Sequence, residues 1–264
     1  MKFYKLTATG NDFILFDNRD GSIQGDDGEF FRLICRRRLS VGADGILLVE
    51  KSDAHDFSLR YFNSDGSLGE MCGNGARAAS HFAHVAQIAG AKMSFDVVGI
   101  EYTAEIRDAG VTLTMPAPVE IREFPEAVEE PFLSEGAWLN VGVPHYVLFA
   151  EDVDGLDVIP LGRKYRHHAN FQPWGTNVNF VQIVDAHRMK IRTYERGVED
   201  ETFACGTGTI SSVITAVKQK NMKQPVEAEL LGGILRVELE NDLSRIYLTG
   251  EARIVFEGAL RDYE

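Results

Sequence analysis

The stretch MCGNGARAAS, residues 71–80, sets the pattern from which the fold of this chain can be predicted. Its cysteine, Cys72, precedes a Gly-x-Gly turn and a run of apolar residues at helical spacing, and Cys205 stands in the same setting in ACGTGTISS, residues 204–212. We therefore expect each thiol at the N-terminus of a helix. Aligned peptide dipoles and unpaired N–H groups there favour a thiolate and lower the thiol pKa.

The two cysteines belong to a longer internal repeat, whose period is about half of the 264-residue chain. GNDFILF, residues 10–16, matches GVPHYVLF, residues 142–149, at nearly the same separation. An aromatic residue also precedes both Asn63 and Glu195, which are again nearly as far apart. Two repeats of this length do not make a solenoid, so the repeat predicts two pseudo-symmetric domains with a cleft between them.

Short alternating or β-branched runs dominate the sequence, and Asp-Gly or Gly-Gly pairs in the turns between them are typical of antiparallel hairpins. Residues 74–90 and 206–220 have a helical pattern instead, with the apolar and small residues of a buried helix. The sequence therefore predicts an α+β fold. Each domain is expected to be a mostly antiparallel or mixed sheet wrapped around a central buried helix, with the active site in the cleft.

The predicted domains divide the chain near its middle. The first is expected to hold residues 1–117, joined by the C-terminal residues 257–264, and the second residues 118–256. The acidic, proline-bearing stretch 116–131 is the expected connector.

Composition narrows the range of partners and compartments. A net charge of −13 and an isoelectric point near 5.0 argue against nucleic acid or an anionic membrane as a partner. No apolar run is long enough to span a bilayer, and the N-terminus lacks the hydrophobic region of a signal peptide. Three cysteines, an odd and small number, favour free thiols in a reducing cytoplasm, with Cys35 expected in the core.

Two matched thiols that face one reacting atom from opposite sides suit stereoinversion at a carbon, because one thiolate removes a proton and the other thiol returns one. Two thiolates charged together would repel, so we expect one thiol and one thiolate at rest. Without a cofactor, the site itself must stabilise the carbanion. Backbone N–H groups at the two helix starts can bind a carboxylate and its developing charge: Gly73, Asn74, Gly206 and Thr207.

Six motifs, in this order and over essentially the whole chain, resemble those of the diaminopimelate epimerase family: TATGNDF, FNSDGS, MCGNGAR, GxPHxV, YERG and ACGTG. The resemblance implies an isomerase that interconverts L,L-2,6-diaminopimelate and the meso form in lysine and peptidoglycan-precursor biosynthesis. It also implies a cytoplasmic homodimer that uses neither pyridoxal phosphate nor any other cofactor, and no metal.

The resemblance assigns catalytic roles to four residues. In the direction from the L,L to the meso form, it implies that Cys205 accepts a proton and Cys72 donates one. It implies that His145 and Glu195 tune the thiol pKa values.

Further residues are expected to contact the substrate. The planar, two-pronged guanidinium of Arg196 suits the distal carboxylate, whereas a surface ion pair is its plainer interpretation. The resemblance implies polar substrate contacts by Asn11, Asn63, Asn177 and Glu195, although asparagines before Gly or Asp are often only turn residues.

The chain departs from the family pattern at Val143, where relatives often carry Asn, and at Gly45, where they can carry Gln. Two alternatives to a diaminopimelate epimerase stay open. One is a proline or hydroxyproline racemase-type epimerase, which a second charged binding residue such as Arg196 argues against. The other is a catalytically silent amino-acid-binding protein on the same fold, which the two retained thiols argue against.

Overall fold

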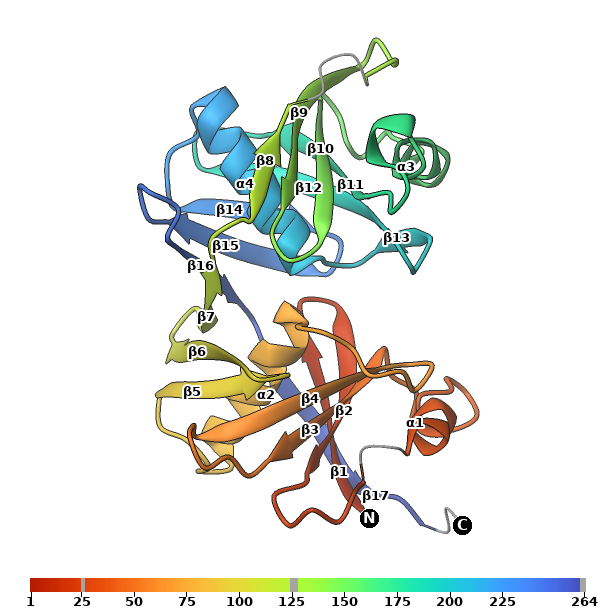
Figure 1. The fold of residues 1–264 in the computed structure, drawn as a ribbon, viewed down its shortest axis with the longest axis vertical. Helices are drawn as coiled ribbons and strands as arrows, with labels where there is room; N and C mark the ends of the chain where they lie inside the picture. The colour runs from red at the N-terminus through yellow and green to blue at the C-terminus, as the bar shows by residue number, and fades with distance from the viewer. Residues whose placement is uncertain (25–26, 124–127, 262–264) are drawn as a thin grey trace. The chain divides into compact units, whose positions relative to one another are not determined.

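The computed structural model describes residues 1–24, 27–123 and 128–261. The chain forms two compact units, one made of Met1–Thr114 with the residues from Thr249 onward, and the other of Met115–Leu248. The described residues form a mixed α/β fold, mostly sheet, with four α-helices (Figure 1). The chain enters the second unit along β7 (Gly110–Pro116) and returns along β16 (Arg245–Gly250).

In the first unit, consecutive strands from β1 to β6 pair in antiparallel and parallel directions in turn. The β1–β2, β3–β4, β5–β6 and β6–β7 pairs are antiparallel, the β2–β3 and β4–β5 pairs are parallel, and β17 pairs antiparallel with β1. The elements of this unit other than β7 are β1 (Lys2–Ala8), β2 (Asn11–Asp17), α1 (Gly28–Ile34), β3 (Gly45–Glu50), β4 (Phe57–Asn63), α2 (Gly73–Val85), β5 (Lys92–Val97), β6 (Ile100–Arg107) and β17 (Arg253–Ala259).

The second unit runs through the same order of pairing directions. The β9–β10, β11–β12 and β14–β15 pairs are antiparallel, the β10–β11 and β12–β14 pairs are parallel, and the short β8 and β13 pair antiparallel with β9 and β12. Its elements other than β16 are β8 (Glu120–Arg122), β9 (Leu133–Asn140), β10 (Pro144–Ala150), α3 (Val158–Arg166), the 3₁₀ turn η2 (Ala169–Phe171), β11 (Asn177–Ile183), β12 (Arg188–Glu195), β13 (Asp200–Thr202), α4 (Gly206–Lys220), β14 (Val226–Leu230) and β15 (Gly233–Leu239).

Each of these parallel pairs is joined by a crossover that contains one of the four α-helices, because parallel strands cannot be linked by a tight hairpin. α1 joins β2 to β3, α2 joins β4 to β5, α3 joins β10 to β11, and α4 joins β12 to β14. The expected mixed sheet is therefore confirmed. Helix α3 was not predicted, since Pro160 and Gly162 interrupt its helical pattern.

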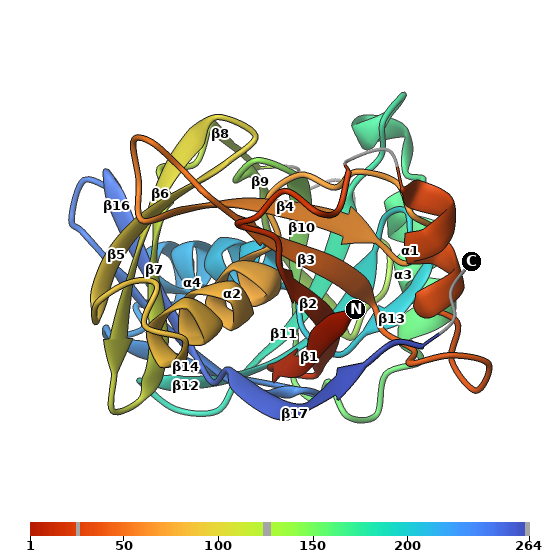
Figure 2. The ribbon, with the colours of Figure 1, turned by 90° about the horizontal axis from the view of Figure 1, so that it is seen from below.

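Helix α2 packs against strands β1, β17, β2, β6 and β3 of its own unit (Figures 1 and 2). Nearly every residue from Asn74 to Ala83 is buried, because small side chains let the strands approach the helix backbone. The predicted helix 74–90 is too long. It ends at Val85, and Gln87 has a left-handed φ of 57°, which interrupts the helical hydrogen-bond ladder.

Helix α4 matches its predicted range and packs against β9, β10, β15 and β11. It ends on Asn221, whose φ of 56° places it in the left-handed conformation of a helix C-cap. Residues Gly208 to Ala216 are buried without interruption. The helices that follow Cys72 and Cys205 are thus each held on most sides by their own unit.

The expected core position of Cys35 is confirmed, because it lies in a cluster of buried apolar side chains of the first unit. Burial raises the pKa of Cys35 to about 12. This thiol is therefore protonated and inert at neutral pH.

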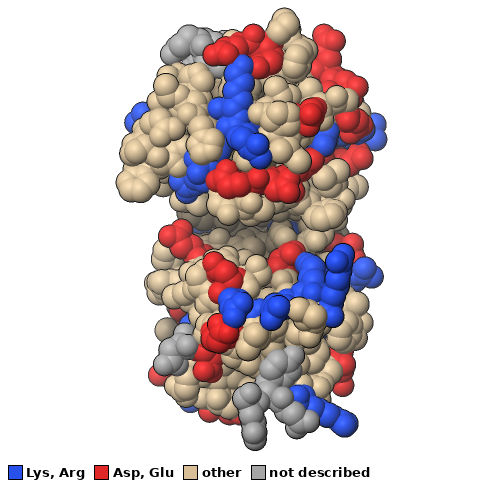
Figure 3. Space-filling view, turned by 90° about the vertical axis from the view of Figure 1, so that its right-hand side faces the viewer, with Lys and Arg blue, Asp and Glu red and all other residues tan. Residues whose placement is uncertain are grey.

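Parts of two predicted segments lie outside the described residues: 124–127 of the connector 116–131, and 262–264 of the C-terminal segment 257–264. On the face drawn in Figure 3, acidic and basic side chains are interspersed. Of the helices in the described ranges, none has the length and apolar character needed to cross a membrane.

Candidate active site

Cys72 and Cys205 occupy the same position at the start of two helices. Cys72 is the N-cap of α2, with φ −113° and ψ 111°, and Cys205 is the N-cap of α4, with φ −124° and ψ 112°. Each Sγ accepts a 3.4 Å hydrogen bond from a backbone N–H three residues on, that of Gly75 or of Gly208. The expected placement of both thiols at helix N-termini is confirmed.

The first N–H groups of an α-helix have no intrahelical acceptor, so the residues directly after each cysteine present donors outward from the helix start. These residues are Gly73 and Asn74 in α2, and Gly206 and Thr207 in α4. No acidic side chain lies in the first turn of either helix. An anion at either helix start therefore meets donors and the positive end of the helix dipole.

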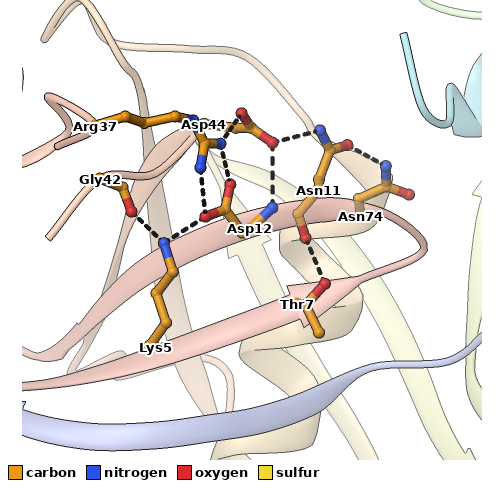
Figure 4. A network of polar contacts seen from close by, with 8 residues as sticks. All are labelled: Lys5, Thr7, Asn11, Asp12, Arg37, Gly42, Asp44 and Asn74. Atoms are coloured by element: carbon orange, nitrogen blue, oxygen red, sulfur yellow. Dashed lines mark hydrogen bonds and ion pairs between the residues drawn. The ribbon is translucent and has the colours of Figure 1, made fainter. Parts of the chain in front are cut away.

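Asn11 connects the start of α2 to a network of ionised side chains (Figure 4). Asn74 Nδ2 donates to Asn11 Oδ1, and Asn11 Nδ2 donates to Asp44 Oδ2 at 3.0 Å. The carboxylate of Asp44 can only accept, so it fixes which way the Asn11 amide points. Asn11 thus presents its oxygen to the helix that carries Cys72.

The network behind Asn11 is held by two cations. Arg37 Nη2 lies 2.7 Å from Asp44 Oδ1 and 2.5 Å from Asp12 Oδ1, and Lys5 Nζ lies 2.5 Å from Asp12 Oδ2 (Figure 4). Burial raises the pKa of Asp12, but hydrogen bonds from Arg37 and Lys5 outweigh it and hold that pKa below its usual range. Asp12 therefore stays ionised, and the network keeps its geometry at neutral pH.

In the second unit, a chain of hydrogen bonds leads to Cys205. His145 Nε2 lies 2.8 Å from Thr207 Oγ1, which lies 3.4 Å from Cys205 Sγ. On the other side of the ring, His145 Nδ1 lies 3.1 Å from Asn179 Nδ2, and Asn179 Oδ1 accepts from Thr193 Oγ1 at 3.0 Å. Because Asn179 donates to Nδ1, the ring proton is assigned to Nε2 and is donated to Thr207. The Thr207 hydroxyl hydrogen is then directed to the sulfur.

His145 is neutral in this environment. Burial, and then the positive charge of Arg196, lower the pKa of His145 to about 3, although the bond to Asn179 acts in the opposite direction. A histidine that stays neutral does not exchange protons near pH 7. The contacts therefore connect His145 to Cys205 through the Thr207 hydroxyl and not through proton exchange.

Glu195 is the charged neighbour of Cys205. Burial raises the pKa of Glu195, while hydrogen bonds from Thr202 and Cys205 lower it, and the Thr202 bond to Oε1 measures 2.6 Å. Burial, and then the Glu195 carboxylate, raise the pKa of Cys205, against hydrogen bonds from Thr207 and the Gly208 N–H. The expected lowering of the thiol pKa is thus wrong for Cys205 in this structure, because burial and a nearby negative charge outweigh the helix terminus.

Arg196 and Asn177 lie next to this chain of contacts. Asn177 is the strand partner of His145, and its Oδ1 accepts the backbone N–H of Arg196 at 2.7 Å. Arg196 Nη1 donates to Trp174 O at 3.3 Å, and within the described ranges no carboxylate forms an ion pair with Arg196. The guanidinium therefore keeps donors for an anionic ligand, and the plainer interpretation as a surface ion pair does not apply among these residues.

The hydrogen bond that the structure gives the Asn63 side chain lies within its own turn. Its Nδ2 donates to Ser67 Oγ at 3.0 Å in the turn after β4, and this contact leaves its Oδ1 to accept from a ligand donor. Gly45, its strand partner, has no room for a side chain, since a Cβ there would lie 2.5 Å from Tyr61 Cε2. The Tyr61 ring fills the space beside Gly45, where a glutamine of the family would extend.

Several residues that position the site were missed by the sequence reasoning. Asn179 follows Asn177 by two residues on one strand, and so lies on the same face, which is a usable signal. Arg77 lies within MCGNGAR, and a charged residue among small, apolar helix residues is a usable signal of a buried polar contact. Asp44 and Thr202 had no signal, because their contacts come from the tertiary fold. No group of three or more His, Cys, Asp or Glu side chains suited to a metal ion occurs in the ranges that the structure describes.

Comparison with known sequences places most of the chain in one family. The sequence model of the family described as diaminopimelate epimerase matches residues 3–120 and 137–255. A diaminopimelate epimerase of Aquifex aeolicus is 42% identical over 277 residues, covering 99% of this chain and 98% of that protein.

Comparison with solved structures concerns the fold alone, because the identities are low. A phenazine biosynthesis protein of the PhzF family from Bacillus anthracis has a TM-score of 0.77 at 13% identity, with 99% of each chain covered. A probable proline racemase from Agrobacterium radiobacter has a TM-score of 0.65 at 13% identity, covering 98% of this chain and 92% of that one. The fold is therefore shared with the PhzF and proline racemase families.

Proposed function

The chain belongs to the diaminopimelate epimerase family, and from that premise we propose that it interconverts L,L-2,6-diaminopimelate and the meso form by a two-thiol mechanism. It is then an isomerase that acts on one α-carbon of a small amino acid. The observation that carries the mechanism is the pair of cysteines at matched helix N-caps.

The two thiols act on opposite faces of the reacting carbon. In the direction from the L,L to the meso form, the Cys205 thiolate takes the α-proton and the electron pair of the broken C–H bond stays on the substrate. The Cys72 thiol then gives its proton to the other face, and its own bonding electrons remain on sulfur. The enzyme is left with a Cys205 thiol and a Cys72 thiolate, which is the form that takes the meso substrate in the reverse direction.

The helix starts stabilise the intermediate. The α-carboxylate binds the N–H groups of Gly73, Asn74, Gly206 and Thr207, whose donors and dipoles also stabilise the charge that develops as the α-proton leaves. These groups begin helices whose following residues are buried, which favours donors that are already in place before the reaction. No separate cofactor enters this scheme.

This mechanism requires the two units to act as pseudo-symmetric domains, with α2 and α4 as their central helices. The equal order of pairing directions in the two units supports this arrangement, as does the equal cap geometry. The internal sequence repeat supports it independently.

Substrate identity rests on groups away from the thiols. The Arg196 guanidinium binds the distal carboxylate by two donors, and Asn11, Asn63 and Asn177 supply polar contacts together with Glu195. His145 and Glu195 tune Cys205. Tyr61 covers the position beside Gly45, and Val143 offers no polar group, so the distal end relies on Arg196. We further propose a cytoplasmic homodimer that serves lysine and peptidoglycan-precursor biosynthesis.

Proton exchange with solvent tests the proposal. Purified protein incubated with L,L-diaminopimelate in D2O is expected to place deuterium at the α-carbon of the meso product, as read by mass spectrometry and NMR. Exchange of proline but not of diaminopimelate would favour a proline racemase-type enzyme. Binding of diaminopimelate without any exchange would show an amino-acid-binding protein instead.

A further inference from the structure

Arg77 is a fully buried arginine on the helix that Cys72 caps. Its side chain has no solvent exposure, and its Nη2 donates to Thr9 Oγ1 at 3.0 Å and to Asn74 Oδ1 at 2.5 Å. Both acceptors are neutral, and Nε and Nη1 have no hydrogen-bond partner in the described ranges. Burying a guanidinium cation without a counter-charge carries a large free-energy cost. We therefore expect an anion near Arg77.

The strands packed against α2 do not supply that anion. Their carboxylates are engaged by other cations: Asp12 by Lys5 and Arg37, Asp17 by Arg19, Glu50 by Arg60, Glu105 by Arg107 and Lys92, and Glu257 by Lys2. The remaining carboxylate on these strands, Glu101, is exposed on β6. On α2 itself the titratable side chains are His81 and His84, and burial followed by the charge of His84 lowers the pKa of His81.

Cys72 caps the helix that carries Arg77, and Asn74, which accepts a hydrogen bond from Arg77 Nη2, lies two residues after Cys72. Burial lowers the pKa of Arg77 to about 10, and the charge of Cys72 acts in the opposite direction. Interaction between two charges is mutual, so a cation that is stabilised by a thiolate also stabilises that thiolate.

We propose that Arg77 is the buried counter-charge of the Cys72 thiolate, and that it sets which of the two reactive thiols is ionised in the free enzyme. Arg77 is fully buried and acts through Cys72, so it is a positioning residue. The inference deepens the proposed function and rests on it, because the charge state of Cys72 selects the substrate form that the enzyme takes.

The second unit has the opposite arrangement. The residue five positions after Cys205 is the buried, apolar Ile210, and the charged neighbour of Cys205 is the carboxylate of Glu195. A cation beside one thiol and an anion beside the other break the symmetry of the two caps. The free enzyme is thus held with Cys72 as thiolate and Cys205 as thiol, the form that takes the meso substrate.

Alkylation measured at each cysteine tests the proposal without substrate. Iodoacetamide is added to the full-length protein from pH 5 to pH 9, and peptide mapping gives the rate at Cys72 and at Cys205. Arg77→Met is expected to slow alkylation of Cys72 at pH 7 by about tenfold, with its pH profile moved upward, and to leave Cys205 unchanged. Arg77→Lys keeps the charge and is expected to restore the profile.

Two matched variants separate charge from packing. Thr9→Val removes a hydrogen bond of Arg77 but keeps its charge, and Ile210→Met changes the equivalent position of α4, so both are expected to leave the Cys72 profile as in the wild type. An unchanged Cys72 profile in Arg77→Met would overturn the proposal, and so would a shift of the same size in Thr9→Val.

A second measurement covers the case in which Arg77→Met does not fold. A thiolate stabilised in the folded state makes the unfolded chain bind more protons, so stability rises with pH up to the ordinary thiol pKa. Wild-type protein is therefore expected to gain stability from pH 6 to pH 8.5 relative to Cys72→Ser, whereas Cys205→Ser follows the wild type. Parallel curves for wild type and Cys72→Ser would overturn the proposal. Neither measurement uses substrate, so the outcome of the D2O experiment stays distinct.

Discussion

The starts of helices α2 and α4 have the same geometry but opposite electrostatics. Both begin at a cysteine with nearly equal backbone angles, and both cysteines accept a 3.4 Å hydrogen bond from the N–H three residues on. A buried arginine lies one turn further along α2, whereas a carboxylate lies beside the cap of α4. In the mechanism that we propose, the repeated backbone supplies two acid–base groups, and a few unrepeated side chains decide which of them holds the proton.

The largest expected effect tests whether both halves are needed. Cys72→Ala and Cys205→Ala are each expected to lower kcat for epimerisation by about 10³-fold or more, because each thiol serves one face of the carbon. Cys35→Ala, which changes a buried and inert thiol, is the matched control and is expected to retain activity. Near-normal turnover by either single variant at the reactive cysteines would exclude the two-thiol mechanism.

Arg196→Lys tests whether the second unit binds the distal carboxylate of the substrate, for which the first unit has no equivalent residue in our proposal. Lysine keeps the charge but loses the two-pronged geometry, so kcat/KM for diaminopimelate is expected to fall by about 10- to 100-fold, or roughly 1.5–3 kcal/mol. Arg192→Lys is the matched control, because Arg192 is committed to an ion pair with Glu201. An unchanged kcat/KM in Arg196→Lys would show that the distal carboxylate binds elsewhere.

Glu195→Gln should make the environment of Cys205 more like that of Cys72. Removing the carboxylate leaves burial as the main cause that raises the pKa of Cys205, so its alkylation at pH 8 is expected to become about tenfold faster while Cys72 is unaffected. Thr202→Val, which removes only a hydrogen bond to Glu195, serves as the control. Slower alkylation of Cys205 in Glu195→Gln would contradict the assigned sign.

The smallest expected effect concerns the stability that His145 contributes. Folding lowers the pKa of His145 from its ordinary value of 6.5 to about 3, so between these values the unfolded chain binds more protons than the folded one. Stability is thus lost as the pH falls from 6.5. Urea unfolding at pH 7 and pH 5 is expected to show a smaller loss for His145→Gln than for the wild type. Equal losses would mean that His145 is charged in the folded protein.

The sequence predicted the features that depend on local pattern. The Gly-x-Gly turns and the small residues after each cysteine predicted both helices and their caps, because helix starts are encoded within a few residues. Helix α3 was not predicted because Pro160 and Gly162, two poor helix formers, interrupt its helical pattern. The end of α2 was predicted beyond Val85 because the apolar pattern continues after it.

The electrostatic differences between the two helix starts could not be predicted from the local sequence pattern. The pKa of Cys205 depends on Glu195, which reaches it from strand β12, and on burial that the whole unit provides. The positions of Asp44 and Thr9 likewise follow from strand pairing and turns rather than from neighbouring residues. A helix terminus can be predicted from sequence, but the net charge around it requires the tertiary structure.

Direct titration of the two thiols in the wild-type protein tests the central claim of opposite electrostatics. Protein labelled with ¹³C at cysteine Cβ would be titrated by NMR from pH 5 to pH 10 without substrate, with Cys72→Ser and Cys205→Ser used to assign the signals. Cys72 is expected to ionise first, at a lower pH than Cys205, and Cys35 not at all. Ionisation of Cys205 before Cys72, or of both at the same pH, would contradict the claim.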